Sequence, residues 1–350
     1  MDNVFPNKRL VNHLLAKSKF TLPHQVVAWM GAMQAQDFNM VKWAIGVRIP
    51  DCTEKMVVDS FNKGEILRIH VLRPTWHLVA PEDIRWMLQL TAPRIVSSMK
   101  SRDDELGITG KFCATGFQII EKALRDNHHL TRDELVERLQ MNKIAVNSSQ
   151  MYHLMFHAEL TGLVCSGVLQ EKEQTYALLE ERVPEVKPLS RDEALAKMAK
   201  TYFTGHAPAT LQDFVWWSGL SVADARNGLE SVKPFLVSEK YDERIYWMPS
   251  DTENIAAENE KVHLLPAFDE YIVAYKNRSA VLPEANYQRA VSSNGVFRPV
   301  IMRNGRVIGI WKKEVRKNKT ISTNFFVPVE KITQELTNEA EICFKKFLND

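Results

Sequence analysis

The chain has 350 residues, of which 45% are hydrophobic and 25% are charged, and its formal net charge is +2. These values are ordinary for a folded protein and exclude disordered, collagen-like and disulfide-scaffold compositions. At this length we expect two or three domains instead of one large core. The longest stretch without a formal charge, residues 20–36, contains a proline, a histidine and three glutamines, so it is not a membrane span.

The four cysteines lie far apart in the sequence and form no C-x-x-C pair: Cys52, Cys113, Cys165 and Cys343. This spacing predicts reduced, buried thiols and not a zinc site. The N-terminal residues also lack the apolar segment of a secretory signal. We therefore expect a cytoplasmic protein with no membrane partner, no bound metal and no other cofactor.

In chain order, a pattern of two or three short helices followed by two strands occurs three times. In the first occurrence, leucines at helical spacing predict a helix over residues 7–18, and Pro23 begins a second helix. A third helix is predicted over 53–62, ended by Gly64. Residues 66–79 then favour two strands separated by a break.

The second and third occurrences follow the same order and differ almost completely in sequence. Their predicted helices span 117–126, 131–140, 148–160, 194–203, 210–217 and 222–232, and their predicted strands span 163–169, 175–179, 235–238 and 245–248. The runs Thr131–Glu134 and Ser190–Glu193 are typical capping boxes. Three helices and a hairpin are the plan of a winged-helix motif, so we expect a mainly α, α+β protein with β wings.

The chain changes character after a polar linker over 251–260. Strands are predicted over 263–265, 271–275, 296–302, 307–311 and 320–327, with Asn304-Gly305 as a type I′ hairpin turn. Such strands favour a small β-barrel or a curved sheet. A helix is predicted over 330–348, with four apolar residues on its covered face: Ile332, Leu336, Ile342 and Phe347.

Positive charge gathers in the same C-terminal part of the sequence. Residues 261–320 contain twelve Lys or Arg and four acidic residues, a net charge of +8. This segment is therefore a candidate contact for a polyanion. A solvated strand surface explains the same charges equally well.

The usual signatures of nucleotide-binding and hydrolytic enzymes are missing from the sequence, including the Walker A, GxGxxG, HExxH and GxSxG motifs. Gln34 and Gln36 stand out near the end of the second predicted helix. In a helix they would diverge by about 200°, but in extended backbone they share a face, which requires the helix to end near Met33. The alternative is that both glutamines satisfy backbone groups at the helix end.

A second group of polar residues lies in the predicted hairpin over 66–79. Two histidines and two arginines alternate there with apolar residues: Arg68, His70, Arg73 and His77. They are candidates to bind phosphate or to act near a reacting sugar, and hydrogen-bonded structural roles remain the alternative. Further along, Trp216 and Trp217 are adjacent, so they cannot both face one core, and one is expected at an interface or stacked on a base.

Five segments, taken in order, carry a resemblance to a known family. They are residues 31–37 (GAMQAQD), 73–77 (RPTWH), 175–179 (TYALL), 216–219 (WWSG) and 264–271 (LLPAFDEY). Together they resemble the bacterial winged-helix DNA-binding domain-containing proteins, the superfamily of the AlkZ-like DNA glycosylases. The resemblance extends from about Leu10 to Leu348.

The resemblance implies a C-shaped array of tandem winged-helix motifs completed by a β-barrel and embracing duplex DNA. The implied boundaries are 1–100, 101–185 and 186–250 for the three motifs and 261–350 for the barrel with its C-terminal helix. The family's catalytic Gln–apolar–Gln motif is matched by Gln34 and Gln36. In the family, a hairpin of the barrel probes the DNA groove. Residues 303–306 occupy the corresponding place in this chain.

The residues assigned from motif and charge form three sets. The catalytic pair is Gln34 and Gln36; the possible supporting residues are Asp37, His70, Arg73 and His77; the DNA-binding residues are Arg303, Arg306, Lys312, Lys313, Arg316 and Lys317. Asp37 is equally compatible with an electrostatic role and with a helix cap or a salt bridge.

Glutamine is neither an acid nor a base near neutral pH, so it cannot protonate a poor leaving group. An N7-alkylated purine is already cationic and leaves without protonation, so two carboxamides need only position water and stabilise an oxocarbenium-like sugar. We therefore expect a monofunctional DNA-repair glycosylase that acts as a monomer on double-stranded DNA, with interstrand crosslinks among its candidate substrates. The alternatives are a non-catalytic winged-helix regulator or architectural protein, and a protein or RNA scaffold.

Overall fold

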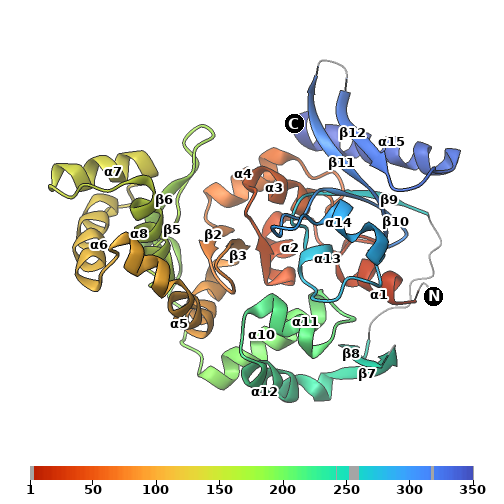
Figure 1. Cartoon of the computed structure of the whole chain (residues 1–350), viewed down its shortest axis with the longest axis horizontal. Coiled ribbons are helices and arrows are strands. Elements are labelled where there is room, and N and C mark those ends of the chain that lie inside the picture. Colours follow the sequence, from red (N-terminus) through yellow and green to blue (C-terminus); the bar gives the residue numbers. More distant parts are fainter. Residues whose placement is uncertain (1–3, 242, 252–259, 317–318, 350) are drawn as a thin grey trace. The chain divides into compact units, whose positions relative to one another are not determined.

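The computed structural model describes residues 4–241, 243–251, 260–316 and 319–349 (Figure 1). The chain packs into two compact units. The first joins Met1–Val58 to Leu195–Asp350, and the second is Asp59–Ala194. Within the described ranges, none of the helices is both long and apolar enough to cross a bilayer.

The first unit is built from both ends of the chain. Its N-terminal elements are α1 (Val4–Asn12), α2 (Pro23–Met30), β1 (Ala32–Gln34), α3 (Phe38–Gly46) and the start of α4 (Glu54–Asn62). Its middle elements are most of α10 (Arg191–Gly205), then α11 (Leu211–Ser218), α12 (Val222–Val232), η1 (Lys233–Phe235), β7 (Leu236–Tyr241) and β8 (Arg244–Pro249). Its C-terminal elements are β9 (Val262–Leu265), α13 (Glu270–Val273), η2 (Glu284–Asn286), α14 (Tyr287–Ala290), β10 (Val300–Arg303), β11 (Arg306–Arg316), β12 (Lys319–Phe325) and α15 (Lys331–Asn349).

The C-terminal strands form an open sheet, which corrects the prediction of a barrel. Among the described residues, its antiparallel order is β12-β11-β10-β9, so β12 and β9 are edges and no pairing closes the sheet. The predicted turn between β10 and β11 is confirmed, because Asn304 and Gly305 both have positive φ angles, 49° and 77°. The predicted strand over 271–275 is wrong: the Asp269 carboxylate caps the backbone there into α13.

The C-terminal helix α15 packs against β9, β12 and α3. Phe347 is buried as predicted, but Ile332 and Ile342 are exposed, and Phe344 is buried in their place. Both buried rings contact the indole of Trp43. The covered face of α15 is therefore rotated from the one that the sequence pattern indicated.

The second unit contains the following elements. They are the end of α4, β2 (Leu67–His70), β3 (Trp76–Val79), α5 (Pro81–Leu106), α6 (Gly110–Leu124), β4 (Leu130–Thr131), α7 (Arg132–Met141), α8 (Ser148–Leu160), β5 (Val164–Ser166), β6 (Thr175–Leu178), α9 (Leu179–Arg182) and the start of α10. Strands β2 and β3 pair antiparallel, and a second sheet has the order β4-β6-β5. Apolar residues of α6, α7, α8, β5 and β6 form its buried core.

The predicted order of three helices and a hairpin recurs in the structure. Helices α6, α7 and α8 precede β5 and β6, and helices α10, α11 and α12 precede β7 and β8. The capping boxes at Thr131 and Ser190 are confirmed by reciprocal hydrogen bonds to Glu134 and Glu193. The assignment of these groups as winged-helix motifs stays a prediction.

Some helices differ from the sequence pattern. Helix α1 ends at Asn12, six residues early, because Leu14 adopts a left-handed φ of 60°. Helices α3 and α5 were not predicted. Pro93 lies inside α5, where proline usually disfavours a helix, but buried residues such as Trp86 and Leu90 hold this helix in place.

The cysteines are free thiols whose exposure only partly follows the prediction. Cys52 and Cys165 are buried, and burial raises the pKa of the Cys52 thiol to about 11 and that of Cys165 to about 12. Cys113 is half-buried, and Cys343 is exposed, contrary to the expectation of burial.

Candidate active site

The Gln–Ala–Gln segment leaves the end of α2 as extended backbone. Helix α2 ends at Met30, three residues before the predicted point, and β1 carries the chain to Gln34. Gly31 makes the turn with a φ of 72°, and a β-carbon there would lie 2.6 Å from Cγ2 of Thr201. Only glycine meets both the left-handed angle and the close approach, so this residue fixes where the segment begins.

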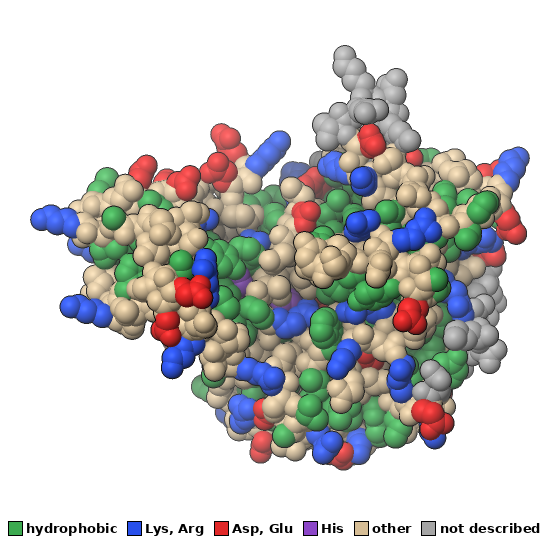
Figure 2. All heavy atoms as spheres, viewed as in Figure 1, with side chains coloured by type: hydrophobic (Ala, Val, Ile, Leu, Met, Phe, Trp, Pro, Cys, Tyr) green, Lys and Arg blue, Asp and Glu red, His purple; other side chains and the backbone are tan. Residues whose placement is uncertain are grey.

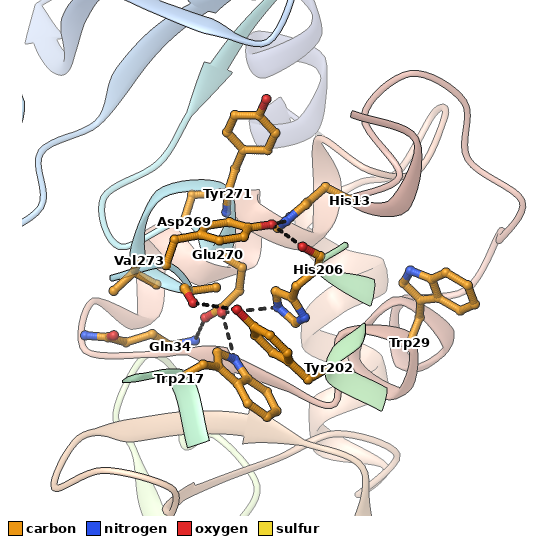
Figure 3. Close-up of polar contacts among 12 residues, drawn as sticks. His13, Trp29, Gln34, Tyr202, His206, Trp217, Asp269, Glu270, Tyr271 and Val273 are labelled. Atoms are coloured by element: carbon orange, nitrogen blue, oxygen red, sulfur yellow. Dashed lines mark hydrogen bonds and ion pairs between the residues drawn. The ribbon is translucent and has the colours of Figure 1, made fainter. Parts of the chain in front are cut away.

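Gln34 is held by its backbone. Its amide nitrogen donates a hydrogen bond of 2.8 Å to Oε1 of Glu270, and the residue is only 7% exposed. Figure 3 shows this nitrogen facing Glu270 while the Gln34 side chain extends in the opposite direction. The backbone contact thus leaves the carboxamide directed away from the carboxylate that anchors it.

Gln36 and Asp37 follow as exposed residues. The Asp37 carboxylate accepts a hydrogen bond of 3.1 Å from the backbone nitrogen of Met40, so Asp37 is the N-cap of α3. The structure therefore contains the helix cap that the sequence left open as one of the roles of Asp37. The segment is bounded by Glu270 on one side and by the start of α3 on the other.

The Glu270 carboxylate is 1% exposed and joins three segments of the first unit. Besides the Gln34 amide, it accepts a hydrogen bond of 3.2 Å from Nε1 of Trp217, and Nε2 of His206 lies 3.5 Å from Oε2 (Figure 3). Glu270 is the first residue of α13. It therefore connects β1, α11 and α13 through one buried anion.

The neighbouring Asp269 fixes the position of α13. Its carboxylate forms two hydrogen bonds of 2.8 Å with the guanidinium of Arg48, and both side chains are fully buried. It also caps α13 through the Tyr271 amide. Because buried, bidentate pairs of this kind tolerate little displacement, Arg48 and Asp269 orient the helix that presents Glu270.

Buried aromatic groups pack near the Glu270 carboxylate. Nε2 of His13 donates to the Tyr275 hydroxyl at 2.6 Å, and that hydroxyl donates to the carbonyl oxygen of His206 at 2.6 Å. Burial lowers the pKa of His13 well below its usual value and raises the pKa of Tyr275. The ring of Tyr202 stacks on His206 with 4.9 Å between centroids. Tyr202, His206 and Trp217 also pack against one another, which places a cluster of buried rings beside Glu270.

Trp216 and Trp217 separate as expected for adjacent residues on one helix. Trp217 is fully buried, and Trp216 is 39% exposed. Nε1 of Trp216 donates to the carbonyl oxygen of Val273 at 2.9 Å, and its ring faces the Arg278 guanidinium. Trp216 thus binds the end of α13 and keeps part of its ring accessible.

His70 and His77 belong to the second unit and lie on opposite faces of the β2–β3 hairpin. The register pairs His70 with Trp76 and Ile69 with His77, and paired residues share a face. His70 is buried, and its Nδ1 and its backbone nitrogen each lie 2.7 Å from Oε2 of Glu159. The structure therefore does not bring the two predicted imidazoles together on one face.

His77 is fully buried, and its Nδ1 donates to the carbonyl oxygen of Thr75 at 2.9 Å. Burial lowers the pKa of His77 well below its usual value, and the nearby half-buried Arg73 adds to this effect. His77 is consequently neutral near pH 7. The hydrogen bonds of both histidines match the structural roles that the sequence left open as the alternative.

The predicted DNA-binding residues lie on or beside β11. Arg303 is tied to carboxylates: its Nη2 is 2.7 Å from Glu260 and its Nη1 is 3.6 Å from Glu330. Arg306 is half-buried, whereas Lys312 and Lys313 are exposed. Arg316 ends β11, and Lys317 lies outside the described residues.

The turn over 303–306 is packed against the protein. Gly305 is buried; its carbonyl accepts a hydrogen bond of 3.0 Å from the Tyr271 hydroxyl, and a β-carbon on Gly305 would lie 2.7 Å from Pro6. These contacts are intramolecular. On the face in Figure 2, Lys and Arg side chains are interspersed with acidic and hydrophobic ones.

Comparisons with known proteins agree with this architecture. The sequence model of the family described as "DNA glycosylase AlkZ-like" matches residues 27–342. The chain belongs to the AlkZ-like DNA glycosylase family. A relative from Streptomyces sahachiroi, named interstrand DNA cross-link repair glycosylase, is 24% identical over 347 residues, covering 90% of this chain and 89% of the relative.

The solved structure of DNA glycosylase AlkZ from Streptomyces sahachiroi has the same fold. It matches this AlkZ-like glycosylase with a TM-score of 0.80 at 20% identity, and the match covers 99% of this chain and 95% of the other. The expected family and the activity of a DNA glycosylase are thereby confirmed. The roles of single residues are not tested by these matches.

Sequence reasoning on this AlkZ-like glycosylase missed the buried acids. Glu270 lies in the 264–271 segment, which served only as a mark of resemblance, and Glu159 was not singled out. The available signal was a carboxylate inside an apolar run, at Glu159 within α8 and at Glu270 before Tyr271-Ile272-Val273. Among the described residues, a further group with metal-ligand geometry is Asp103, His153 and His157.

Proposed function

We propose that this glycosylase hydrolyses the N-glycosidic bond of cationic N7-alkylated purines in double-stranded DNA, and that Gln34 and Gln36 carry the reaction. The observation that supports this most strongly is the anchored segment. Gln34 is fixed through its backbone by a buried carboxylate, and Gln36 follows two residues later as an exposed side chain. Carboxamides that must position water gain most from a backbone that does not move.

The chemistry of the pair follows from what carboxamides can do. When the glycosidic bond breaks, its electron pair goes to the cationic purine, which leaves as a neutral base, and the sugar becomes oxocarbenium-like. In our proposal, a carboxamide oxygen stabilises the developing positive charge and the second glutamine orients a water molecule. The water oxygen adds to the sugar carbon and releases a proton to solvent, which leaves an abasic site.

We further propose that the substrate range includes bulky adducts and interstrand crosslinks, as the name of the Streptomyces relative describes for that protein. The exposed Lys312 and Lys313 on β11 are our candidates to contact DNA phosphates. We favour the β11–β12 hairpin over the 303–306 turn for this contact, because that turn is packed on Pro6 and Tyr271. Arg316, the last residue of β11, and Lys317, which lies outside the described residues, stay part of the proposal.

The remaining sequence-based expectations stay within the proposal. We assign winged-helix motifs to residues 1–100, 101–185 and 186–250, and the open sheet with α15 to 261–350. His70, Arg73 and His77 would support the DNA surface from the β2–β3 hairpin. We also retain a cytoplasmic location and a monomer that binds DNA without metal-dependent or cofactor-dependent chemistry.

The decisive experiment uses a duplex with a single N7-methylguanine and measures abasic sites by mild alkali cleavage. We expect base release that is abolished in Gln34→Ala and Gln36→Ala, with DNA binding nearly unchanged. Gln334→Ala, on the exposed side of α15, is the matched control and should retain full activity.

Other outcomes separate the alternatives. Full activity in both glutamine variants would refute the proposed mechanism. Absence of release with tight binding, falling steeply between about 50 and 200 mM salt, would direct the assay to a crosslinked duplex. If that substrate also fails, a non-catalytic DNA-binding protein is favoured, and absence of binding favours a scaffold.

A further inference from the structure

A carboxylate and two imidazoles converge between α5 and α8 of the second unit. Oδ1 of Asp103 lies 2.7 Å from Nδ1 of His153, and Oδ2 lies 2.9 Å from Nε2 of His157. The three potential ligand atoms all lie within 4.8 Å of one another. Asp103, His153 and His157 are 8%, 5% and 8% exposed, so the group is buried but close to the surface.

The local sequence places these groups together by helix geometry. His153 and His157 are four residues apart on α8 and therefore share one face. Asp103 lies in the last turn of α5, and the same region is joined to α8 by a hydrogen bond of 3.1 Å from Nε2 of Gln150 to the Leu106 carbonyl. The backbone on both sides is thus held by contacts outside the group.

The partners of the buried Asp103 carboxylate are imidazoles. Within the described ranges, the ion pairs of Asp103 involve the two histidines, and neither Lys nor Arg lies within ion-pair distance of its carboxylate. A buried carboxylate is ordinarily paired with a cation or bound to a metal ion, because desolvation of an uncompensated charge is costly.

We propose that Asp103, His153 and His157 bind one divalent transition-metal ion, with zinc as the best match to the ligands. Two imidazole nitrogens and one carboxylate oxygen suit Zn²⁺, and a water molecule would complete a tetrahedral site. The site would clamp the end of α5 to α8. It is independent of the Gln34 segment and of the proposed glycosylase mechanism.

The geometry requires little change to accept an ion. Metal–ligand bonds of about 2.0–2.1 Å in a tetrahedron separate the ligand atoms by roughly 3.3 Å. The present distances of 2.7 and 2.9 Å are those of direct hydrogen bonds, so these two pairs of atoms must separate by about half an ångström, while the ligand atoms that lie farther apart, all within 4.8 Å of one another, must close on the ion. A proton on the ring nitrogen that faces the carboxylate moves to the other ring nitrogen or to solvent, and the two hydrogen bonds are replaced by metal–ligand bonds.

The test uses the full chain, freed of metal with a chelator and titrated with zinc chloride by calorimetry. We expect one saturable site, weakened at least about tenfold in His153→Gln, in His157→Gln and in Asp103→Asn. His128→Gln is the matched control, because His128 is an exposed imidazole of the same unit that bonds only the Arg125 carbonyl. No saturable site, or equal zinc affinity in wild type and in His157→Gln, would overturn the proposal and leave a hydrogen-bonded triad.

A second measurement avoids the variants if they do not fold. Cobalt(II) added to the metal-free wild type should give the intense ligand-field absorption of a tetrahedral site, and an equivalent of zinc should abolish it. The weak spectrum of hydrated cobalt alone would overturn the proposal. Because neither readout depends on base release, failure of the proposed glycosylase mechanism would leave this result unaffected.

Discussion

The strongest prediction concerns Glu270, the buried acid that anchors Gln34. We expect Glu270→Ala to lower both stability and base release, because the carboxylate accepts the hydrogen bonds of the Gln34 amide and of the Trp217 indole. Both donors lie in a region that water does not reach, so neither regains a partner when the side chain is removed.

The magnitude follows from those two bonds. An unsatisfied buried donor costs about 1–3 kcal/mol, so removal of the carboxylate should cost about 2–6 kcal/mol in total. In Glu270→Gln, the amide oxygen can still accept from Gln34, but its NH₂ group would face the Trp217 N–H, so we expect about 1–3 kcal/mol. If Gln34 shifts by 1 Å when the anchor is lost, base release should fall on the order of 100-fold.

The assay combines urea unfolding with single-turnover base release at a temperature where each variant is folded. Glu339→Ala, an exposed position on α15, controls for loss of a negative charge. The expected order of stability and activity is wild type, then Glu270→Gln, then Glu270→Ala. An alanine variant as stable as wild type would refute the reasoning, and one that is destabilised yet fully active would show that Glu270 does not position Gln34.

Three further changes test other parts of the structure. Asp269→Asn breaks a fully buried pair with Arg48, and urea unfolding should show a loss of about 3–5 kcal/mol; an unchanged midpoint would contradict this. Burial lowers the pKa of His263 to about 4, so below about pH 6.5 the unfolded chain binds a proton at this residue that the folded chain does not, and His263 should contribute a stability loss of about 1.4 kcal/mol per pH unit down to pH 4. In urea titrations at pH 7 and 5, His263→Gln should reduce the slope by that amount, and the buried His13 and His77 should account for a remaining slope. Thr131→Ala removes the cap of α7 and should cost about 1 kcal/mol in thermal unfolding, whereas Thr131→Ser should not.

Local patterns predicted the fold well where one short-range interaction decides the structure. The capping boxes at Thr131 and Ser190 and the Asn304-Gly305 turn lie where the sequence indicated. Each depends on residues within a few positions of one another, so the sequence contains the whole interaction. The helix end near Met33 that a shared face of Gln34 and Gln36 required lies within three residues of the observed end of α2 at Met30, and Gly31 beside it is the local signal for that end.

The predictions failed where contacts between residues distant in sequence determine the local structure. Sheet closure depends on whether β12 meets β9, and strand patterns alone do not contain that information. The segment 271–275 has the composition of a strand, but Asp269 caps it into a helix while bound to Arg48, 221 residues away. The pair His153 and His157 was visible as H-x-x-x-H, but its partner Asp103 is supplied by the packing of a helix that the pattern did not predict.

The candidate site follows the same division between local and distant interactions. The glutamine pair was recognisable from two residues, whereas the extended backbone that the pair requires was left open by the sequence and is found in the structure at β1, directly after Gly31. What holds the pair is a carboxylate 236 residues away, bonded to a tryptophan from a third segment. Carboxamides have no titratable proton to drive a reaction, so their contribution depends on being held in place. The three segments that marked the family resemblance in this unit, 31–37, 216–219 and 264–271, are therefore joined in one structure: the first contains the two glutamines of the proposed mechanism, and the other two supply the indole and the buried acid that anchor Gln34.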